Sequence, residues 1–434
     1  MKLHDDLSKR GPIRIAVVGA GLMGSGLVAQ LKTIQNIDVI LWSSRREDGL
    51  VSKAKDVGLK DDEYAFTCDE NEAKALVCEG KTVLTTDNSL AWRLDGVDAI
   101  CDCTGNTEAG ASINENGLEA GKHIISFNVE CDVLLGPYFL KKAKEKGLCY
   151  TGTAGDEPGA IMELYDFAKF LGFRVVAAGK GKNNPMNVEA TPEALKEEAA
   201  KKGISARMLT SFVDATNTMV ELNAVCNATG LLPDAGGCVG MHATIDALSK
   251  KLRTKDLGGE MNRRGTVNFV HGIAPGVFVS VESDEPVIQR EMPYLSMGDG
   301  PNYIFYRPYH LTNIETPLTI ARAVMYNEAT IAPEAGYVAH TVAVAKRDME
   351  AGEAIEGIGS ATCYGTLVEG ETAYKENLLP IGLIVGETKL ARSVKKGARL
   401  RMDDVILDKS CTLVELFNRE HGRFYALPKN LNVL

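Results

Sequence analysis

Two acidic residues, Asp156 and Glu157, stand side by side in the stretch AGDEPGA, residues 154–160. Neighbouring carboxyl groups can exchange protons with a substrate or bind a cation, whereas one acid at the start of a helix commonly caps its first N–H groups. Both interpretations fit these residue types. The elements on either side of the stretch decide between them.

A second polar group follows in KGKNNP, residues 180–185, where Lys180, Lys182, Asn183 and Asn184 lie close together. Two ammonium groups and two amides can hold a phosphate or orient a polyol, and a lysine can donate a proton to a carbonyl oxygen. The same composition, with its glycine and proline, is also typical of an exposed turn. Composition alone leaves both interpretations open.

The segment PIRIAVVGAGLMGSGLVAQL, residues 12–31, contains a dinucleotide-binding motif. Its β-branched run 13–18 predicts a buried parallel strand, and the apolar spacing after it predicts a helix. The GxGxxG pattern between them allows a tight turn, a close approach of a pyrophosphate and close helix packing, and the helix N-terminus offers N–H groups to the phosphates. The predicted contacts here are Gly19, Gly21, Leu22, Met23 and Gly24.

A second strand, predicted over 37–44, ends where an acidic residue would bind the ribose 2′-hydroxyl of NAD. This chain has Ser43, Ser44, Arg45 and Arg46 at that point instead. Guanidinium groups suit the 2′-phosphate of NADP because they offer paired N–H donors. The sequence therefore predicts NADPH as the cofactor, with Ser43, Arg45 and Arg46 at its 2′-phosphate. A solvated loop is the alternative.

Further buried strands, each followed by a helix, are predicted within 96–111 and 122–136. Thr104 and Gly105 end the first of them, at the carboxyl edge where doubly wound sheets bind ligands. The strand before AGDEPGA ends at the same edge. This placement puts Asp156 and Glu157 near the expected nicotinamide.

The pattern changes after residue 160. A helix is predicted over 161–172, with a packed face made by Ile161, Leu164, Phe167, Ala168 and Leu171. In the segment 206–226, the apolar pattern is typical of a strand in some parts and of a helix in others. Its Glu221 and the following Asn227 are either polar groups in a pocket wall or surface positions of a sheet, and the surface interpretation is favoured.

Arg307 and His310 lie in YRPYHLT, just before a helix predicted near 317–327 that packs on the nucleotide domain. They could hold a phosphate or transfer a proton, although a lone histidine is as often structural. His242, in the glycine-rich run 234–248, is a weaker candidate because no ligand spacing repeats around it.

The motifs GAGLMG, NVE (128–130), AGDEP, AGKGKNNPMNVEATP, TMVE, NATGLLPD and YRPYHLT together resemble the deoxyxylulose-phosphate reductoisomerase-like (DRL) family, which is related in fold to homoserine dehydrogenase. The resemblance covers nearly the whole chain. It implies an NADPH-dependent conversion of 1-deoxy-D-xylulose 5-phosphate to 2-C-methyl-D-erythritol 4-phosphate in isoprenoid biosynthesis. The family is broad, so another small hydroxy-carbonyl substrate is the alternative within it.

The resemblance gives the polar residues roles in proton transfer and oxyanion stabilisation beside a hydride donor. The implied catalytic residues are Asp156, Glu157, Lys180, Lys182, Asn183, Asn184, Arg307 and His310, and Asn128 joins Thr104 and Gly105 at the cofactor. A divalent metal, Mg²⁺ or Mn²⁺, at Asp156 and Glu157 is left open, because adjacent acids in one loop seldom both reach one ion.

From about residue 336, short β-branched runs separated by glycine-containing turns predict a small all-β module. Its phrases AKRDMEAGEAI and ARSVKKGARLRMDDV resemble a SAF domain of β-clip fold. The predicted fold class is therefore α/β, with a Rossmann doubly wound domain over 1–160 completed by the helix near 317–327. An α+β catalytic and dimerisation domain over 161–335 and the SAF-like domain over 336–434 follow.

Composition limits the partners. The chain has 434 residues, of which 45% are hydrophobic and 24% charged, as in a soluble globular protein of two or three domains. A net charge of −10 without a long basic block argues against nucleic acid and anionic membranes. A polar N-terminus and the lack of a spanning apolar run favour the cytoplasm, with the ten cysteines reduced. We expect a phosphorylated small-molecule substrate and a homo-oligomer, either a dimer or a tetramer.

Two other functions fit the same sequence. One is a homoserine dehydrogenase-type NAD(P) oxidoreductase without isomerase chemistry, which the lysines of 180–184 make less favoured. The other is a non-enzymatic NADP-binding sensor, which would need no lysine, acid and amide groups near the nicotinamide.

Overall fold

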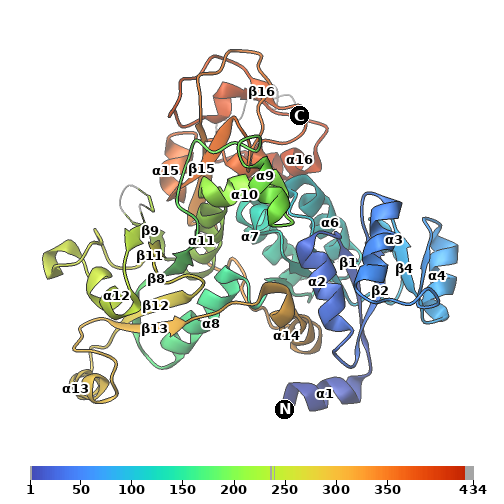
Figure 1. The fold of residues 1–434 in the computed structure, drawn as a ribbon, viewed down its shortest axis with the longest axis horizontal. Coiled ribbons are helices and arrows are strands. Elements are labelled where there is room, and N and C mark those ends of the chain that lie inside the picture. The colour runs from blue at the N-terminus through green and yellow to red at the C-terminus, as the bar shows by residue number, and fades with distance from the viewer. Residues whose placement is uncertain (1, 235–236, 239, 426–434) are drawn as a thin grey trace. The chain divides into compact units, whose positions relative to one another are not determined.

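The computed structural model describes residues 2–234, 237–238 and 240–425, and their contacts divide the chain into two compact units (Figure 1). The first unit comprises residues 1–159 and 311–332, and the second comprises 160–310 and 333–434. The C-terminal hundred residues thus group with the predicted catalytic segment. The division into three domains stays a prediction.

A parallel seven-stranded sheet forms the centre of the first unit, in the order β3-β4-β2-β1-β5-β6-β7. The chain runs outward from β1 to β2 and later returns to β5 on the other side of β1, as in a Rossmann-like doubly wound sheet. The predicted α/β class with a doubly wound sheet is confirmed. The strands are β1 (Ile13–Val18), β2 (Ile37–Ser43), β3 (Tyr64–Phe66), β4 (Thr82–Thr85), β5 (Ala99–Asp102), β6 (His123–Ser126) and β7 (Tyr150–Gly152).

Amphipathic helices cover this sheet, and the helix predicted near 317–327 is among them. It runs over Thr312–Tyr326 as α14 and packs beside α2 (Figure 1), with Ile320 and Ala321 buried in the core. Leu318, in the same helix, is 45% exposed. The helices of this unit are α1 (Lys2–Arg10), α2 (Leu22–Leu31), α3 (Glu47–Asp56), α4 (Glu70–Cys78), α5 (Leu90–Arg93), α6 (Thr107–Glu119), α7 (Val129–Glu145), α8 (Glu157–Phe170, continuing into the second unit) and α14.

A mixed sheet in the order β10-β11-β8-β12-β13 organises the second unit, and β9 also pairs with β11. β10, β11 and β8 run parallel to one another, whereas β12 is antiparallel to both of its neighbours, β8 and β13. The strands are β8 (Arg174–Lys182), β9 (Leu232–Pro233), β10 (Met241–His242), β11 (Thr266–His271), β12 (Val277–Glu282), β13 (Tyr303–Arg307), β14 (Ala339–Ala345), β15 (Cys363–Glu369), β16 (Lys389–Leu390) and β17 (Val405–Ile406). The helices are α9 (Lys196–Lys201), α10 (Ala206–Val213), α11 (Thr216–Thr229), α12 (Ile245–Lys251), α13 (Pro286–Tyr294), α15 (Gly370–Lys375) and α16 (Thr412–His421), with 3₁₀ turns at Lys255–Leu257, Ile381–Leu383 and Met402–Asp404.

The all-β prediction for the C-terminal segment is wrong, because α15 and α16 lie within it. In α16 the side chains of Leu413, Val414, Leu416 and Phe417 are buried, which is the spacing of an amphipathic helix. This helix was not predicted from the sequence because the short β-branched runs of the segment favoured strands. The resemblance to a SAF domain stays a prediction.

The helix predicted over 161–172 begins earlier, at Glu157, and ends at Phe170. Ile161 and Ala168 are buried as expected, but Phe167 is 55% and Leu171 51% exposed. Leu171 lies beyond the helix end, and Phe167 contacts the ring of Phe305 edge-on at a centroid distance of 5.5 Å. Glu157 therefore belongs to the first turn of a helix.

None of the helices in the described part of the chain combines the length and the apolar character needed to span a bilayer.

Candidate functional site

The glycine motif forms the turn between β1 and α2. Gly19 has a φ of +111°, and a Cβ there would lie 2.6 Å from the carbonyl oxygen of Cys103. A Cβ at Gly24 would lie 2.1 Å from the oxygen of Gly19. A Cβ at Gly21 would meet no atom within 4 Å, so this position faces open space at the N-terminus of α2, where Leu22 is 59% exposed. This shape fits a pyrophosphate approaching the backbone.

The end of β2 carries the residues predicted at the 2′-phosphate. Arg45 and Arg46 are exposed just after β2, and Arg46 immediately precedes α3. Ser43 is fully buried, and its carbonyl oxygen accepts a hydrogen bond from the amide of Gly19 at 3.0 Å. A buried hydroxyl cannot meet a ligand at the surface, so this arrangement favours the two arginines over Ser43.

A buried carboxyl group organises the end of β5. Asp102 accepts hydrogen bonds from the amide of Thr104 at 3.0 Å, the Thr104 hydroxyl at 2.6 Å and the Asn128 amide group at 3.0 Å. Burial raises the pKa of Asp102, and these hydrogen bonds act in the opposite direction. Asn128 also donates to Thr104 Oγ1 at 3.2 Å, so the structure brings these two predicted cofactor contacts together beside the exposed Gly105.

Asp156 and Glu157 lie where β7 passes into α8, and both are half-buried. The loop before them is fixed by α14, because the amide of Ala154 donates to Thr319 Oγ1 at 2.8 Å. Over the described residues, no three His, Cys, Asp or Glu side chains gather as a metal ion would require. The divalent metal left open at Asp156 and Glu157 stays a prediction.

Lys180 and Lys182 lie in β8 and are only 5% and 6% exposed, so the exposed-turn interpretation of this stretch is wrong for both lysines. They point to the same face of the strand, since side chains alternate along it. Gly181, between them, faces the turn after β11, where a Cβ would lie 2.4 Å from Ala274 Cα. The alternation of glycine and lysine thus places both ammonium groups on one side.

Both lysines have partners in the helices on that side. Lys180 forms a buried ion pair with Glu221 of α11, and Asn217 Nδ2 donates to the other carboxylate oxygen at 2.7 Å. Lys182 Nζ donates to the carbonyl oxygen of Phe212 at 2.7 Å. Glu221 is buried in a helix, and so is Asn227, which corrects the expectation that they were surface positions of a sheet.

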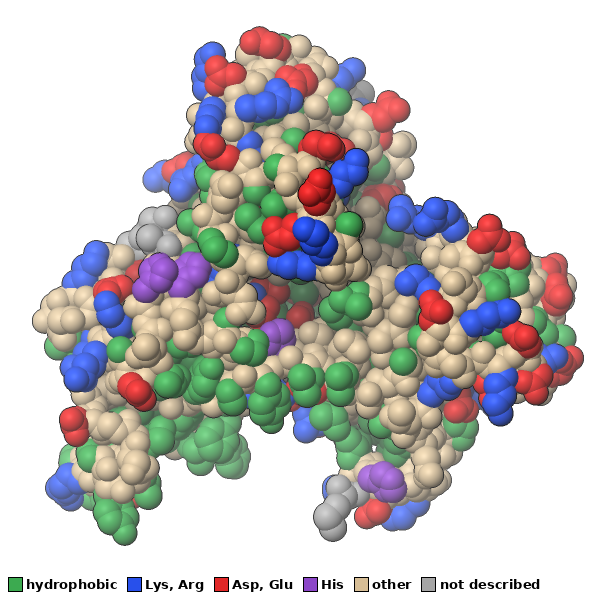
Figure 2. Space-filling model, viewed as in Figure 1, with side chains coloured by type: hydrophobic (Ala, Val, Ile, Leu, Met, Phe, Trp, Pro, Cys, Tyr) green, Lys and Arg blue, Asp and Glu red, His purple; other side chains and the backbone are tan. Residues whose placement is uncertain are grey.

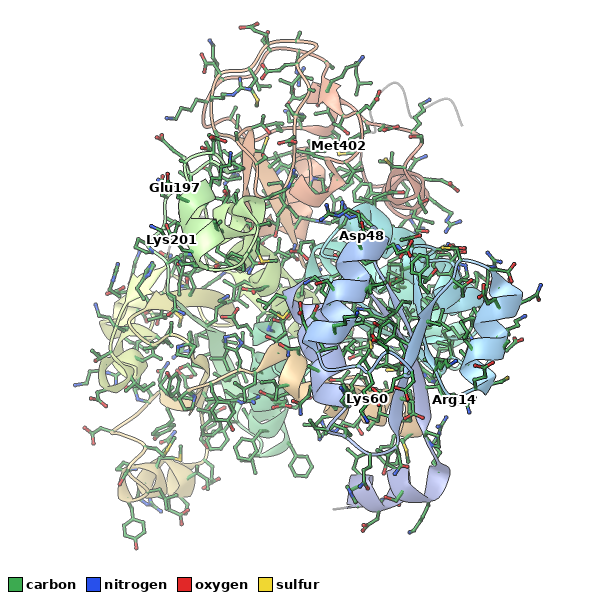
Figure 3. The ribbon with its side chains drawn as sticks, turned by 45° about the vertical axis from the view of Figure 1, so that its right-hand side comes forward. Arg14, Asp48, Lys60, Glu197, Lys201 and Met402 are labelled. Atoms are coloured by element: carbon green, nitrogen blue, oxygen red, sulfur yellow. The ribbon has the colours of Figure 1, made fainter. Side chains whose placement is uncertain are left out.

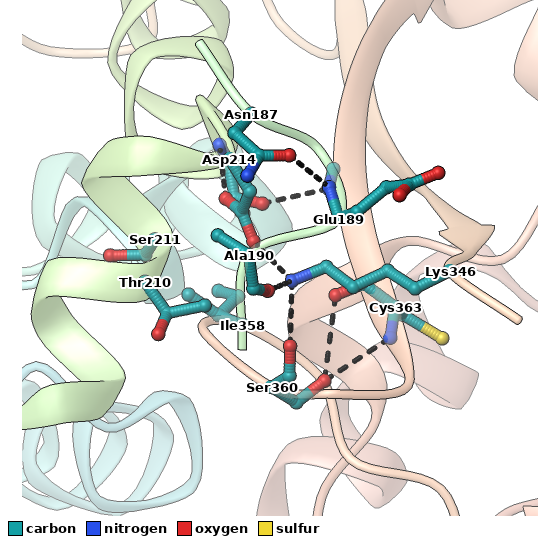
Figure 4. A network of polar contacts seen from close by, with 12 residues as sticks. Asn187, Glu189, Ala190, Thr210, Ser211, Asp214, Lys346, Ile358, Ser360 and Cys363 are labelled. Atoms are coloured by element: carbon teal, nitrogen blue, oxygen red, sulfur yellow. Dashed lines mark hydrogen bonds and ion pairs between the residues drawn. The ribbon is translucent and has the colours of Figure 1, made fainter. Parts of the chain in front are cut away.

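The loop after β8, which carries the exposed Asn183 and the half-buried Asn184, is anchored by a buried lysine from β14's end (Figure 4). Lys346 Nζ donates to the carbonyl oxygens of Ala190 at 2.6 Å and Ser360 at 2.7 Å. It also pairs with Asp214 at 2.8 Å, and the two side chains are 3% and 0% exposed. A residue of the C-terminal segment therefore holds the loop that follows Lys182.

We predict that Lys346→Met lowers the free energy of unfolding by about 3–5 kcal/mol, because Asp214 would stay buried without its cation. Thermal unfolding followed by circular dichroism measures the effect. Lys396→Met is the matched control, since Lys396 pairs with Glu189 of the same loop at the surface, where the side chains are 56% and 61% exposed. Equal and small shifts in the two variants would contradict the prediction.

Arg307 ends β13, and its guanidinium donates to Glu163 of α8 at 3.0 Å. It also lies over the ring of Tyr309, 4.5 Å from the centroid. His310, three residues further on, is half-buried. Arg307 is thus engaged with a carboxylate, and its predicted role at a substrate phosphate stays a prediction.

The structure brings together Thr104 with Asn128 in the first unit, and Lys180 with Lys182 in the second. Asp156 and Glu157 precede the boundary between the units, and the lysines follow it. Their predicted approach across a substrate stays a prediction.

Sequence reasoning missed Asp102 and undervalued Glu221. Asp102 stands between the buried Cys101 and the half-buried Cys103 at the end of an apolar run, and an acid in that position is a signal of a hydrogen-bonded site. Glu221 lies within a helix whose side chains are buried along most of its length. An acid in such a helix needs a buried partner, and a nearby strand with two lysines could have suggested one.

Residues 155–316 match the family model described as the catalytic domain of the oxidoreductase DRL. Among curated proteins, none matches this chain in sequence. The match covers the whole of the second unit's first segment, residues 160–310, including both lysines of β8, and supports an oxidoreductase.

Three solved structures that this chain resembles are distant from it in sequence. A protein described as a probable dehydrogenase from Thermotoga maritima is 14% identical with a TM-score of 0.43, and the likeness covers 75% of this chain and 92% of that one. A scyllo-inositol dehydrogenase from Lactobacillus casei is 12% identical (TM-score 0.36, 68% and 76% covered). A DOX-P reductoisomerase in complex with magnesium is 15% identical (TM-score 0.42, 73% and 70% covered).

Proposed function

We propose that this chain is an NADPH-dependent oxidoreductase that acts on a small phosphorylated hydroxy-carbonyl compound. The first substrate to test is 1-deoxy-D-xylulose 5-phosphate, with 2-C-methyl-D-erythritol 4-phosphate as the product. A nicotinamide cofactor is supported by the doubly wound sheet, the open position at Gly21 and the exposed guanidinium groups of Arg45 and Arg46.

The observation that carries the proposal is the pair of buried lysines in β8. Removing an ammonium group and a carboxylate from water costs several kcal/mol each, and a well-packed apolar pair would often be at least as stable. Perturbed, buried charges cluster at functional sites for this reason. Lys180, Lys182 and Glu221 lie within the segment that matches an oxidoreductase catalytic domain.

The side chains allow a division of roles. With 1-deoxy-D-xylulose 5-phosphate, the carbon skeleton would first rearrange, one C–C bond breaking as another forms, to give an aldehyde, and bound NADPH would supply a hydride to the aldehyde carbon. Lys182, whose hydrogen-bond partner Phe212 offers a neutral carbonyl, would donate a proton to the carbonyl oxygen as negative charge develops there. Lys180, held by the carboxylate of Glu221, would keep its charge and stabilise that oxygen. Asp156 or Glu157 would accept the proton of the neighbouring hydroxyl group.

Loss of NADPH absorbance tests the proposal, with 1-deoxy-D-xylulose 5-phosphate, homoserine's aldehyde precursor and related hydroxy-aldehydes as separate substrates. Turnover with the first supports a reductoisomerase. Turnover only with unphosphorylated aldehydes would favour the homoserine dehydrogenase-type alternative. NADPH binding without turnover of any of them would favour a sensor.

Substitution of the two acids by amides distinguishes chemistry from a helix cap. We expect at least one of Asp156→Asn and Glu157→Gln to lower turnover by about 100-fold or more, a loss typical of an acid–base group. NADPH affinity and circular dichroism should stay unchanged, because an amide keeps the size of the side chain and can still accept the hydrogen bond of a cap. Parental turnover in both variants would show that the loop is structural.

A further inference from the structure

Two histidines and a lysine form a row across the second unit's sheet. His242 of β10 pairs in register with His271 of β11, which pairs in register with Lys182 of β8. The three strands are parallel, so the three side chains emerge on the same face at the strands' carboxyl ends. The carboxyl edge of parallel strands is where ligands commonly bind.

The two imidazole rings stack at a centroid distance of 4.7 Å and an interplanar angle of 19°. Figure 2 shows histidine side chains, coloured purple, reaching the surface of the face drawn. The ring of Phe269 packs edge-on against His271 at 5.7 Å and supports it from behind. The pair is therefore held in place while His242 remains exposed.

A pocket with a volume of about 410 Å³ opens in front of the pair. Its lining residues are Asn183, Pro185, Met186, Gly240, His242 and His271. The lining contains N–H donors from two imidazoles and one amide, together with an apolar wall, and none of the lining residues that the structure describes is acidic. This volume is in the range of small-ligand pockets.

The charges around the pair favour an anion. Burial lowers the pKa of the His271 imidazole, and the electrostatic effects of His242 from β10 and Lys182 from β8 lower it further. A hydrogen bond to the backbone of Lys182 acts in the opposite direction. A dianion in the pocket would relieve this repulsion, whereas a cation would add to it. A transition metal would also lack a third ligand among the residues that line the pocket.

We propose that His242, His271 and Asn183 form a binding site for a phosphoryl group. The inference deepens the proposed function, because it gives the phosphate of the substrate a place one strand from Lys182. The phosphoryl group could belong to a phosphate ester or to free inorganic phosphate, and the chemistry of recognition is the same. The test below needs neither cofactor nor turnover, so its failure and the failure of the proposed function are distinguishable.

The experiment is a titration of the full-length protein, labelled with ¹³C in its histidines, followed by NMR. The resonances lost in His242→Gln and His271→Gln identify the two rings. We expect both resonances to shift saturably with sodium phosphate at constant ionic strength, and the pKa of His271 to rise by roughly one unit. His4, whose side chain is 75% exposed in the N-terminal helix, is the internal control for unspecific effects of ions.

The source of the phosphoryl group follows from a second titration. Saturation by 1-deoxy-D-xylulose 5-phosphate at tenfold lower concentration than by inorganic phosphate supports an ester, and equal concentrations support free phosphate. Shifts that chloride reproduces, or that His4 shares, would overturn the proposal. So would stoichiometric binding of Zn²⁺ to the pair without any response to phosphate.

Discussion

Replacing Lys182 by methionine is expected to lower kcat by ~10²–10⁴-fold and to leave the affinity for NADPH unchanged. Methionine keeps the length of the side chain and fills its buried position at the end of β8, so the effect isolates the ammonium group. Steady-state kinetics with the substrate identified by NADPH oxidation measures it. An increase in KM alone would show that Lys182 binds the substrate without donating a proton.

Two controls make this result interpretable. Lys201→Met removes a lysine from the exposed end of α9 (Figure 3) and should leave kcat unchanged. Lys180→Met should instead lower stability, by about 3–5 kcal/mol, because it leaves Glu221 buried without its cation. The double variant Lys180→Met with Glu221→Leu should recover stability but not turnover. Full activity of Lys182→Met would remove this lysine from the chemistry.

The cofactor contacts predict the second large effect. The double variant Arg45→Ala with Arg46→Ala should weaken NADPH binding by about 1–3 kcal/mol, or roughly 5–150-fold, as expected for lost charge-assisted hydrogen bonds. NADH lacks the 2′-phosphate, so its affinity should hardly change. Titration calorimetry with both cofactors measures the difference.

Ser43→Ala serves as the comparison for the arginines. Because Ser43 is fully buried, this change should leave the preference for NADPH over NADH as it is. A parent protein with equal affinities for the two cofactors would contradict the predicted role of the arginines. A large loss of NADPH affinity in Ser43→Ala would contradict the reading of that residue as buried away from the ligand.

Much of the first unit was predictable because the residues that determine each of its elements lie close together in the sequence. The β-branched run of β1, the glycines after it and the apolar spacing of α2 lie within twenty residues. Gly24 has a steric reason within that window, because a Cβ there would meet the carbonyl oxygen of Gly19, whereas the contact at Gly19 comes from the distant Cys103. The same holds for β5 and β6, whose apolar runs are short and are bounded by polar residues.

The burial of Lys180 and Lys182 could not be predicted in that way. Their surroundings are polar in sequence and resemble a turn, and their partners come from α10 and α11, dozens of residues away. The buried ion pair of Lys346 and Asp214 could not be predicted either, because its two residues lie even further apart in the sequence. Burial of a charge depends on whether a distant opposite charge or carbonyl group is brought to it, which no local pattern encodes.

The fold of the first unit is completed by residues 311–332, which follow most of the second unit in the chain. We therefore expect the parts of the first unit to fold in a defined order during synthesis. Gly152 at the end of β7 donates to the carbonyl oxygen of Ile331 at 2.9 Å, and Thr319 and Thr330 share a buried hydrogen bond at 2.7 Å. We therefore expect the last edge of the sheet to stay open during synthesis until α14 and the residues after it have left the ribosome. Such non-local closure slows folding and leaves apolar surface exposed to chaperones in the meantime. Pulse-labelled hydrogen exchange of stalled nascent chains should find β1 and β2 protected before β7, and simultaneous protection would refute this order.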